Sequence, residues 1–199
     1  MHPGGAAPCP RLSGGGAHFV RAPYRPCADV GCSSLPGGDS QADEVLQERR
    51  IGGDLLDVLR DLNRLASELA DERPVEQSDL SERAVFDYPA QAMRELLMNA
   101  VIHRNYEDST TPTLVNHYID RIEIQNPGGL YGDLTNEQFP HGTSYRNPIL
   151  AEAAKVLGFV NRFGRGIKVA QRELERNESP LAVFDPRPSF FHVTVRRRS

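Results

Sequence analysis

The sequence lacks the features that mark membrane-spanning, secreted and disulfide-built proteins. Its 199 residues contain no apolar run long enough for a transmembrane helix. No apolar core follows the first residues, as it would in a secretory signal. Three cysteines are too few for a disulfide framework. We therefore expect a cytoplasmic protein with free thiols and no membrane partner.

Several common catalytic motifs are also missing. There is no Walker A sequence, which argues against a P-loop nucleotide site. A His-Glu-x-x-His zinc helix and a Gly-x-Ser-x-Gly elbow are absent as well. Four residues separate Cys27 from Cys32, and Cys9 stands alone. This spacing favours unpaired reduced thiols over a zinc site, which usually needs close cysteine pairs.

Glycine and proline are concentrated at the N-terminus. Residues 1–38 hold 8 of the 17 glycines and 6 of the 15 prolines, with few branched apolar residues. Such a composition cannot bury much apolar surface, so we predict a disordered lead-in over residues 1–38.

Turn residues and apolar periodicity predict the elements of the remaining chain. Helices are expected at 40–50, from Asp54 towards Pro74, and at 90–103, 149–157 and 166–176. Extended segments are expected at 83–88, 113–119, 121–125, 181–184 and 190–195. Together they predict an α/β (α+β) fold: a two-layer sandwich whose mixed, mostly antiparallel sheet is covered on one face by helices.

The helix expected at 90–103 carries the first candidate site residues. Glu95 and Asn99 are four residues apart and share a helix face, and His103 lies one turn further. An amide oxygen can ligate Mg²⁺, and a carboxylate can orient or deprotonate a water molecule. The same spacing is common on exposed polar helix faces, so alone it does not identify a site.

Two glycine turns follow this helix. Gly128 and Gly129 come after a strand, and Gly164-Arg165-Gly166 opens a helix. Glycine lets a backbone approach a ligand closely, and a helix N-terminus attracts phosphate. Ordinary turns use the same residues, so the order of helix, hairpin, glycine turn, loop and second glycine turn is more informative than either turn.

In this order the sequence resembles the GHKL (Bergerat-fold) ATPases, which include gyrase, histidine kinases, MutL and heat-shock chaperones. Segment 94–100 looks like their N box, and segments 126–130 and 163–167 look like their two glycine boxes. Within this superfamily the chain is most similar to the ATP-binding domain of a family labelled as transcriptional regulators and as RecG C-terminal-like. That domain usually follows a Schlafen-type AlbA domain. The resemblance covers about residues 54–195.

The resemblance also implies a domain organisation. Segments 29–34 and 48–50 look like the end of an AlbA-type domain, so residues 1–38 are interpreted as the lead-in with a remnant of that domain. Residues 39–53 would be a linker helix, and residues 54–199 the GHKL-like ATP-binding domain. The chain would then be a truncated or rearranged family member.

Carried over residue by residue, the resemblance implies a site for ATP and Mg²⁺. Glu95 would be the general base, and Asn99 would ligate Mg²⁺. Residues 131–161 would form a lid. Asn126 stands where the wider superfamily has an aspartate that accepts a hydrogen bond from adenine, and an amide oxygen can accept the same bond. The remaining nucleotide-binding residues would be His103, Gly128, Gly129, Gly164, Arg165 and Gly166.

The sequence thus predicts an ATP-binding regulatory domain, a candidate ATPase and a candidate homodimer. Two alternatives stay open. One is a DNA-binding regulator that uses the fold as a scaffold, suggested by the nine basic and four acidic residues of segment 160–199, which ends in Arg196-Arg197-Arg198. We favour a solvated, frayed terminus as the explanation of these arginines, and DNA contact could need a separate domain. The other alternative is a truncated fragment without activity.

Overall fold

A computed structural model describes residues 28–35, 47–70, 72–78, 81–107, 111–142, 144–160 and 164–198. Its larger sheet has six strands in the order β2-β1-β5-β6-β8-β7. Strands β1 and β5 run parallel, and every other neighbouring pair is antiparallel. The strands are β1 (Ala28–Ser34), β2 (Gln47–Gly53), β5 (Thr113–His117), β6 (Arg121–Pro127), β7 (Val183–Pro186) and β8 (Phe190–Arg196).

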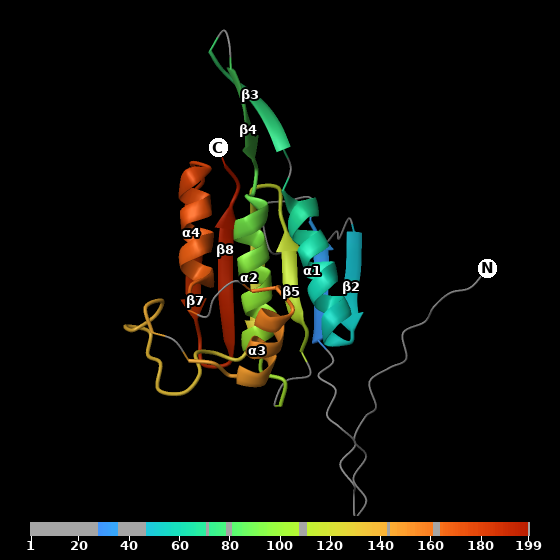
Figure 1. Cartoon of the computed structure of the whole chain (residues 1–199), viewed down its shortest axis with the longest axis vertical. Helices are drawn as coiled ribbons and strands as arrows, with labels where there is room; N and C mark the ends of the chain where they lie inside the picture. Colours follow the sequence, from blue (N-terminus) through green and yellow to red (C-terminus); the bar gives the residue numbers. More distant parts are fainter. Residues whose placement is uncertain are drawn as a thin grey trace, which may run out of the picture.

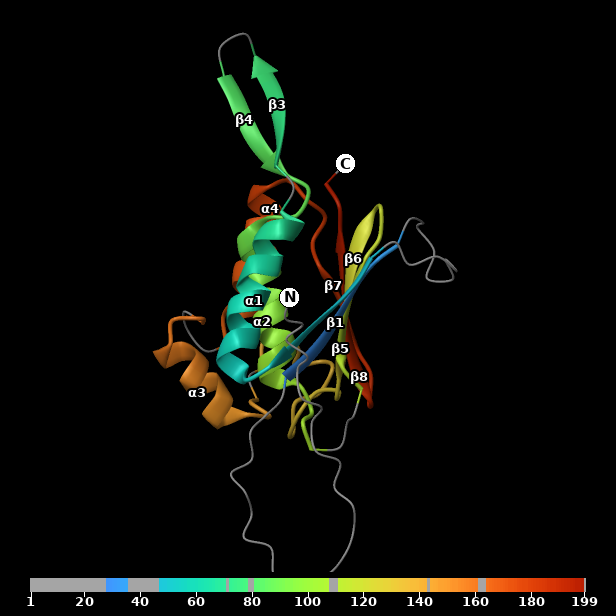
Figure 2. The same ribbon diagram turned by 90° about the vertical axis from the view of Figure 1, so that its right-hand side faces the viewer.

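Helices form the second layer. Figure 2 shows α1 (Leu55–Leu69), α2 (Ala90–His103) and α4 (Gly166–Arg176) on one face of the sheet, with α3 (Pro148–Val156) further out. No helix within the described ranges is long and apolar enough to cross a membrane. The core between the layers includes Leu59, Leu62, Met93, Leu97, Ile122, Ile124 and Leu174. The predicted two-layer fold is therefore confirmed.

Helix α1 forms where the apolar periodicity predicted it. The Asp54 carboxylate accepts a hydrogen bond from the Asp57 backbone N–H at 3.1 Å and so caps the helix. The buried face comprises Val58, Leu59, Leu62, Leu65, Ala66 and Leu69. Capping and burial act together, because a helix of this length gains most of its stability from packing an apolar face.

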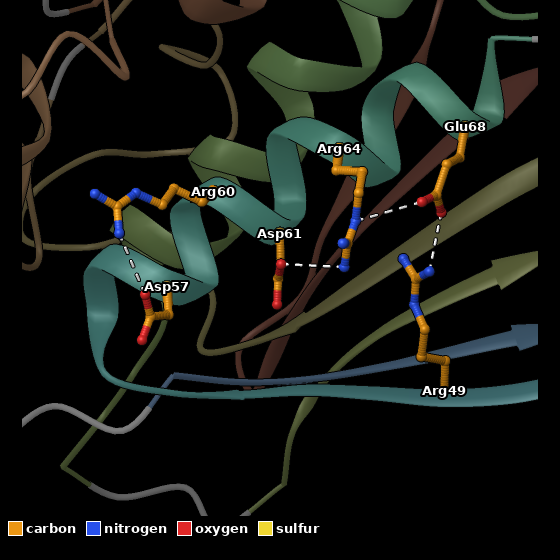
Figure 3. Close-up of polar contacts among 6 residues, drawn as sticks. All are labelled: Arg49, Asp57, Arg60, Asp61, Arg64 and Glu68. Carbon is orange, nitrogen blue, oxygen red and sulfur yellow. Dashed lines mark hydrogen bonds and ion pairs between the residues drawn. The ribbon is translucent and has the colours of Figure 1, made fainter.

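Ion pairs follow the outer face of α1 and join it to β2 (Figure 3). Arg64 lies 3.1 Å from Asp61 and 3.5 Å from Glu68. Glu68 also meets Arg49 of β2 at 3.0 Å. Exposed pairs of this kind contribute only about 0–1 kcal/mol each. Of the pairs named here, the one between Arg49 and Glu68 links the edge strand β2 to the helix layer.

The N-terminal part of the fold differs from the prediction. Residues 47–53 of the expected linker helix form strand β2, and residues 28–34 of the expected lead-in form β1. Val30 and Ile51 face each other in the register and are 1% and 3% exposed. This buried pairing outweighs local helix propensity. Both strands belong to the main sheet, so the sheet crosses the boundary expected at residues 53 and 54.

The other predictions for this region concern residues that the structure does not describe. Residues 1–27 and 36–46, which include Cys9, Cys27 and the rest of the expected helix, lie outside the described residues. Cys32 lies half-buried on β1, where burial raises the pKa of its thiol to about 11.

A separate hairpin links α1 to α2. Strands β3 (Glu72–Ser78) and β4 (Ser81–Phe86) pair antiparallel in a sheet of their own. Figure 1 shows this hairpin projecting beyond the two layers. Helix α2 then begins at Ala90 after Pro89, as the sequence predicted, because proline is well tolerated where a helix starts.

Candidate functional site

A cavity of about 150 Å³ lies among α2, the ends of β6 and β8, and the start of α4. Most of its lining is apolar, including Leu96, Ile124, Leu130, Ile167 and Val193. Seven of the predicted site residues line it: Asn99, His103, Asn126, Gly128, Gly129, Gly164 and Gly166. Glu95 and Arg165 do not line it; Glu95 is buried next to it, and Arg165 is an exposed residue at the start of α4.

The start of α4 meets the polar face of α2 at Gly166. A Cβ atom built on Gly166 would lie 2.8 Å from Asn99 Nδ2 and 3.2 Å from Glu95 Oε2. The absence of a side chain at Gly166 therefore lets the α4 backbone approach both polar groups. No side chain caps α4. Its first backbone N–H groups, which lie beside Asn99, therefore have no acceptor within the helix, as at any helix start.

Burial shapes the chemistry of Glu95. The residue is 3% exposed, and burial raises the pKa of its carboxyl, with Arg94 opposing the rise. Arg94 Nη1 lies 3.9 Å from Glu95 Oε1. Glu95 therefore keeps its proton to a higher pH than an exposed glutamate does.

Asn126 supplies a fixed polar group in the otherwise apolar lining. Thr113 Oγ1 donates a hydrogen bond to Asn126 Oδ1 at 2.9 Å, and the two residues are 1% and 4% exposed. This bond fixes the amide with its oxygen as acceptor, and that oxygen has a second lone pair. Sequence reasoning missed Thr113, although the register of the expected hairpin could have indicated it: Leu114 pairs with Gln125, so the next residues along are Thr113 and Asn126.

The end of α2 meets the loop before α3 through His103. The His103 ring stacks on Tyr145, with centroids 5.5 Å apart and planes 22° apart. Burial and the nearby Arg146 lower the pKa of His103 to about 4. The imidazole is therefore neutral at neutral pH and is a hydrogen-bonding group without a charge. No pattern in the sequence indicated Tyr145 as its partner.

Gly128 and Gly129 are required by the protein's own packing. A Cβ atom on Gly129 would lie 2.2 Å from the Arg187 carbonyl oxygen. Gly128 has a φ of +94°, and a Cβ atom there would lie 2.9 Å from Asn105 Cβ. The glycine pair lines the cavity, yet the space of the missing side chains is filled by the β7–β8 turn and the chain after α2.

Aromatic rings join the loop after Gly129 to the sheet. The Phe139 ring packs edge-on against Phe184 and Phe191, with centroids 5.5 and 5.3 Å away. All three residues line the cavity. Edge-to-face packing of this kind adds about 0.5–1.5 kcal/mol per pair beyond burial. Phe139 thus anchors the loop that the resemblance led us to expect as part of a lid.

Two side chains tie α3, which lies in the same segment, to α2. At its start, Asn147 Nδ2 donates to the carbonyl oxygens of Ile102 and Arg104 at 2.9 and 2.8 Å. After its end, Arg94 Nη2 donates to the carbonyl oxygens of Gly158 and Phe159 at 3.2 and 2.8 Å. Helix α3 is therefore held at both ends against the helix that carries Glu95 and Asn99.

The residues present fit a nucleotide with Mg²⁺. The cavity is smaller than the roughly 300–1,000 Å³ of sites for drug-sized ligands, so it suits one moiety such as a base. The described residues hold no cluster of three His, Cys, Asp or Glu side chains. Asn99 and Glu95 offer oxygen ligands, and Mg²⁺ typically completes its shell with waters and substrate phosphates.

The C-terminal arginines are docked on the body of the protein. Arg197 Nε lies 2.7 Å from Asp87 Oδ2, and Arg198 Nη2 lies 2.5 Å from Glu178 Oε2. Their backbone N–H groups also bond to the carbonyl oxygens of Asp120 and Asp87. The expectation of a frayed terminus is therefore wrong for these two residues, and their charges are balanced by acidic neighbours.

Comparisons with known proteins support this fold. The DIP2311 protein from Corynebacterium diphtheriae matches with a TM-score of 0.73 at 22% sequence identity, over 87% of this chain. The match covers 35% of that protein, so this chain spans about a third of its length. At this identity the likeness shows a shared fold. No match was found among curated proteins.

A family model matches the part of the chain that holds both glycine turns. The match begins after α2, so it includes Asn126, Gly128 and Gly166 and leaves Glu95 and Asn99 outside. It agrees with the resemblance found in the sequence. Residues 111–195 match the family described as "Putative ATP-dependent DNA helicase recG C-terminal".

Proposed function

We propose that this chain binds ATP, as its Mg²⁺ complex, with the base in the cavity beside α2 and the phosphates at the start of α4, and acts as a nucleotide-responsive regulatory domain. One observation carries the proposal: a single cavity joins Asn126, in an apolar lining, to the uncapped start of α4 at Asn99. An apolar slot with one fixed acceptor suits a purine base. A helix N-terminus beside an amide suits phosphates, because its N–H groups and dipole attract anions.

Each residue has a role that follows from its surroundings. Asn126 Oδ1 would accept a hydrogen bond from the exocyclic amine of adenine, with Thr113 fixing the amide. The first N–H groups of α4 would hold phosphate oxygens, and Asn99 Oδ1 would ligate Mg²⁺. When bound, Mg²⁺ would neutralise phosphate charge.

The proposal gives Glu95 the task of orienting or deprotonating an attacking water. Only the carboxylate form can act as a base, and burial raises the pKa of this group. Turnover would therefore rise with pH through the raised pKa.

Nucleotide binding tests the assignment directly. Asn99→Ala should weaken Mg²⁺-ATP binding at least about tenfold in titration calorimetry, because a metal ligand beside the phosphates is lost. Glu95→Gln should bind like wild type and lose turnover. Asn136→Ala, an exposed asparagine in the loop before α3, is the matched control and should change neither. Wild-type affinity in Asn99→Ala would contradict the assigned site.

A further inference from the structure

The outer surface of α3 is apolar. Its inward residues Leu150, Ala151 and Ala154 are buried, whereas Ile149, Val156 and Leu157 are 86%, 76% and 52% exposed. Together with the partly exposed Ala153, these outer positions follow the spacing i, i+4, i+7 and i+8, which places them on one face. We call Ile149, Ala153, Val156 and Leu157 the outer α3 stripe. A soluble helix normally places polar residues on such a face.

The outer α3 stripe is held in a fixed position. Asn147 and Arg94 bond the two ends of α3 to α2 and its flanking carbonyl groups. Figure 2 shows α3 on the outer side of the helix layer, away from the sheet. The stripe is therefore a preformed surface, and a partner would not have to order it on binding.

Two opposite charges flank the stripe on the same side. Glu152 and Lys155 are one turn apart, with Lys155 Nζ 3.5 Å from Glu152 Oε1 and the side chains 56% and 45% exposed. Apolar and charged residues of this surface are arranged almost symmetrically along the chain on the two sides of Ala153. Ile149, four residues before Ala153, corresponds to Leu157, four residues after it. The oppositely charged Glu152 and Lys155 lie one residue before Ala153 and two residues after it.

We propose that the outer α3 stripe docks against the same stripe of a second copy of this chain, with the two helices antiparallel. A two-fold axis near Ala153 would place Ile149 of one copy on Val156 and Leu157 of the other. In an antiparallel pair the same flanks meet, so each Glu152 would face the Lys155 of the partner. A self-complementary patch of this kind is what a two-fold interface requires.

The small residue at the centre favours a close approach. Ala153 on the axis would let the two helices pack at the short end of the usual 8–10 Å interaxial range. Few side chains take part, so the interface belongs to the small, transient class, and association should depend on protein concentration. This inference does not depend on the nucleotide proposal, because the stripe faces away from the cavity that Ala151 lines.

Charge exchange tests the pairing most sharply. The full chain is examined by sedimentation velocity at low salt, over a concentration series up to about 100 µM, where a complex of micromolar Kd is populated. Wild type should shift from monomer towards dimer as concentration rises. Glu152→Lys places like charges across the axis and should raise the dimer Kd at least about tenfold. The double variant E152K/K155E restores opposite pairs and should restore the dimer.

A second set of variants tests the apolar contact. Ile149→Ser with Val156→Ser should abolish dimerisation, while Leu181→Ser, at a 54% exposed position outside α3, should leave it intact. Circular dichroism checks that each variant is folded. A wild-type chain that stays monomeric throughout the series would overturn the proposal. So would a dimer that ignores the α3 variants, or a double charge variant that fails to restore association.

Discussion

Gly166 is the residue at which the start of α4 contacts the polar face of α2 in the candidate site. Any side chain there would enter the space between α4 and the polar pair Asn99 and Glu95. The nearest atom is the amide end of Asn99, which can rotate away without moving the backbone. A side chain at position 166 should therefore displace the Asn99 side chain and fill the space through which a ligand reaches the start of α4.

Gly166→Ala should consequently separate binding from stability. We expect Mg²⁺-ATP affinity to fall at least about tenfold, while the free energy of unfolding changes by less than about 1 kcal/mol, since alanine is well suited to helices. Calorimetric titration and chemical denaturation measure the two effects. Gly31→Ala, in β1 and outside the cavity, is the matched control. Undiminished affinity in Gly166→Ala would show that nucleotide does not use this contact.

His103 gives the fold a calculable pH dependence. The pKa of His103 is about 4 in the folded chain against 6.5 for the free side chain, so between these values the unfolded chain binds more protons. The stabilisation is complete above about pH 6.5 and is lost as pH falls towards 4. Because one pKa unit corresponds to about 1.4 kcal/mol, the loss amounts to as much as about 3 kcal/mol.

His103→Gln should remove the pH-dependent part of the stability that His103 contributes. The difference in unfolding free energy between wild type and His103→Gln, measured by denaturation at several pH values, should narrow as pH falls from 7 to 4. His117 also has a lowered pKa, but it is present in both proteins and cancels in the difference. A difference that stays constant with pH would show that burial and Arg146 do not perturb His103.

At the scale of elements, α3 is the part of the site whose attachment is most easily tested. Asn147→Ala removes two hydrogen bonds, from Nδ2 to the carbonyl oxygens of Ile102 and Arg104. At about 0.5–1.5 kcal/mol each, their loss should lower the free energy of unfolding by about 1–3 kcal/mol.

The same variant should also loosen α3 locally. We expect faster amide hydrogen exchange across Pro148–Val156, with little change in α1, whose Asp54 cap is untouched. An exchange rate in α3 equal to that of wild type would mean that Asn147 does not hold the helix. Asn136→Ala serves again as the control, because Asn136 lies in the exposed loop before α3.

At the scale of the whole molecule, α3 separates two surfaces with different chemistry. Its inward residue Ala151 lines the cavity, and its outer stripe faces solvent. A change in the cavity that shifts α3 would therefore also shift the proposed contact with a second copy. The family match over residues 111–195 includes α3 and the strands β5, β6, β7 and β8 of the main sheet. Strands β1 and β2 belong to the same sheet but precede the matched residues.

Most of the local structure could be predicted from the sequence. Apolar periodicity located α1 and α2, and Pro89 marked the start of α2. Strand β6 runs two residues past its predicted end, because Asn126 and Pro127 still pair with β8. These signals are local, because a cap, a proline or a repeating apolar face acts within one or two turns of chain. The order of the two glycine turns likewise pointed to one cavity before its lining was known.

The remaining features depend on contacts that form only in the folded chain. Strands β1 and β2 form because Val30 pairs with Ile51 and because β1 also pairs with β5. No local sequence pattern encodes these pairings. The partners of Asn126 and His103, and the docking of Arg197 on Asp87, join residues from different elements. Contacts between segments distant in sequence depend on sheet order and layer packing, so a single sequence shows which residues are present and the fold shows which of them meet.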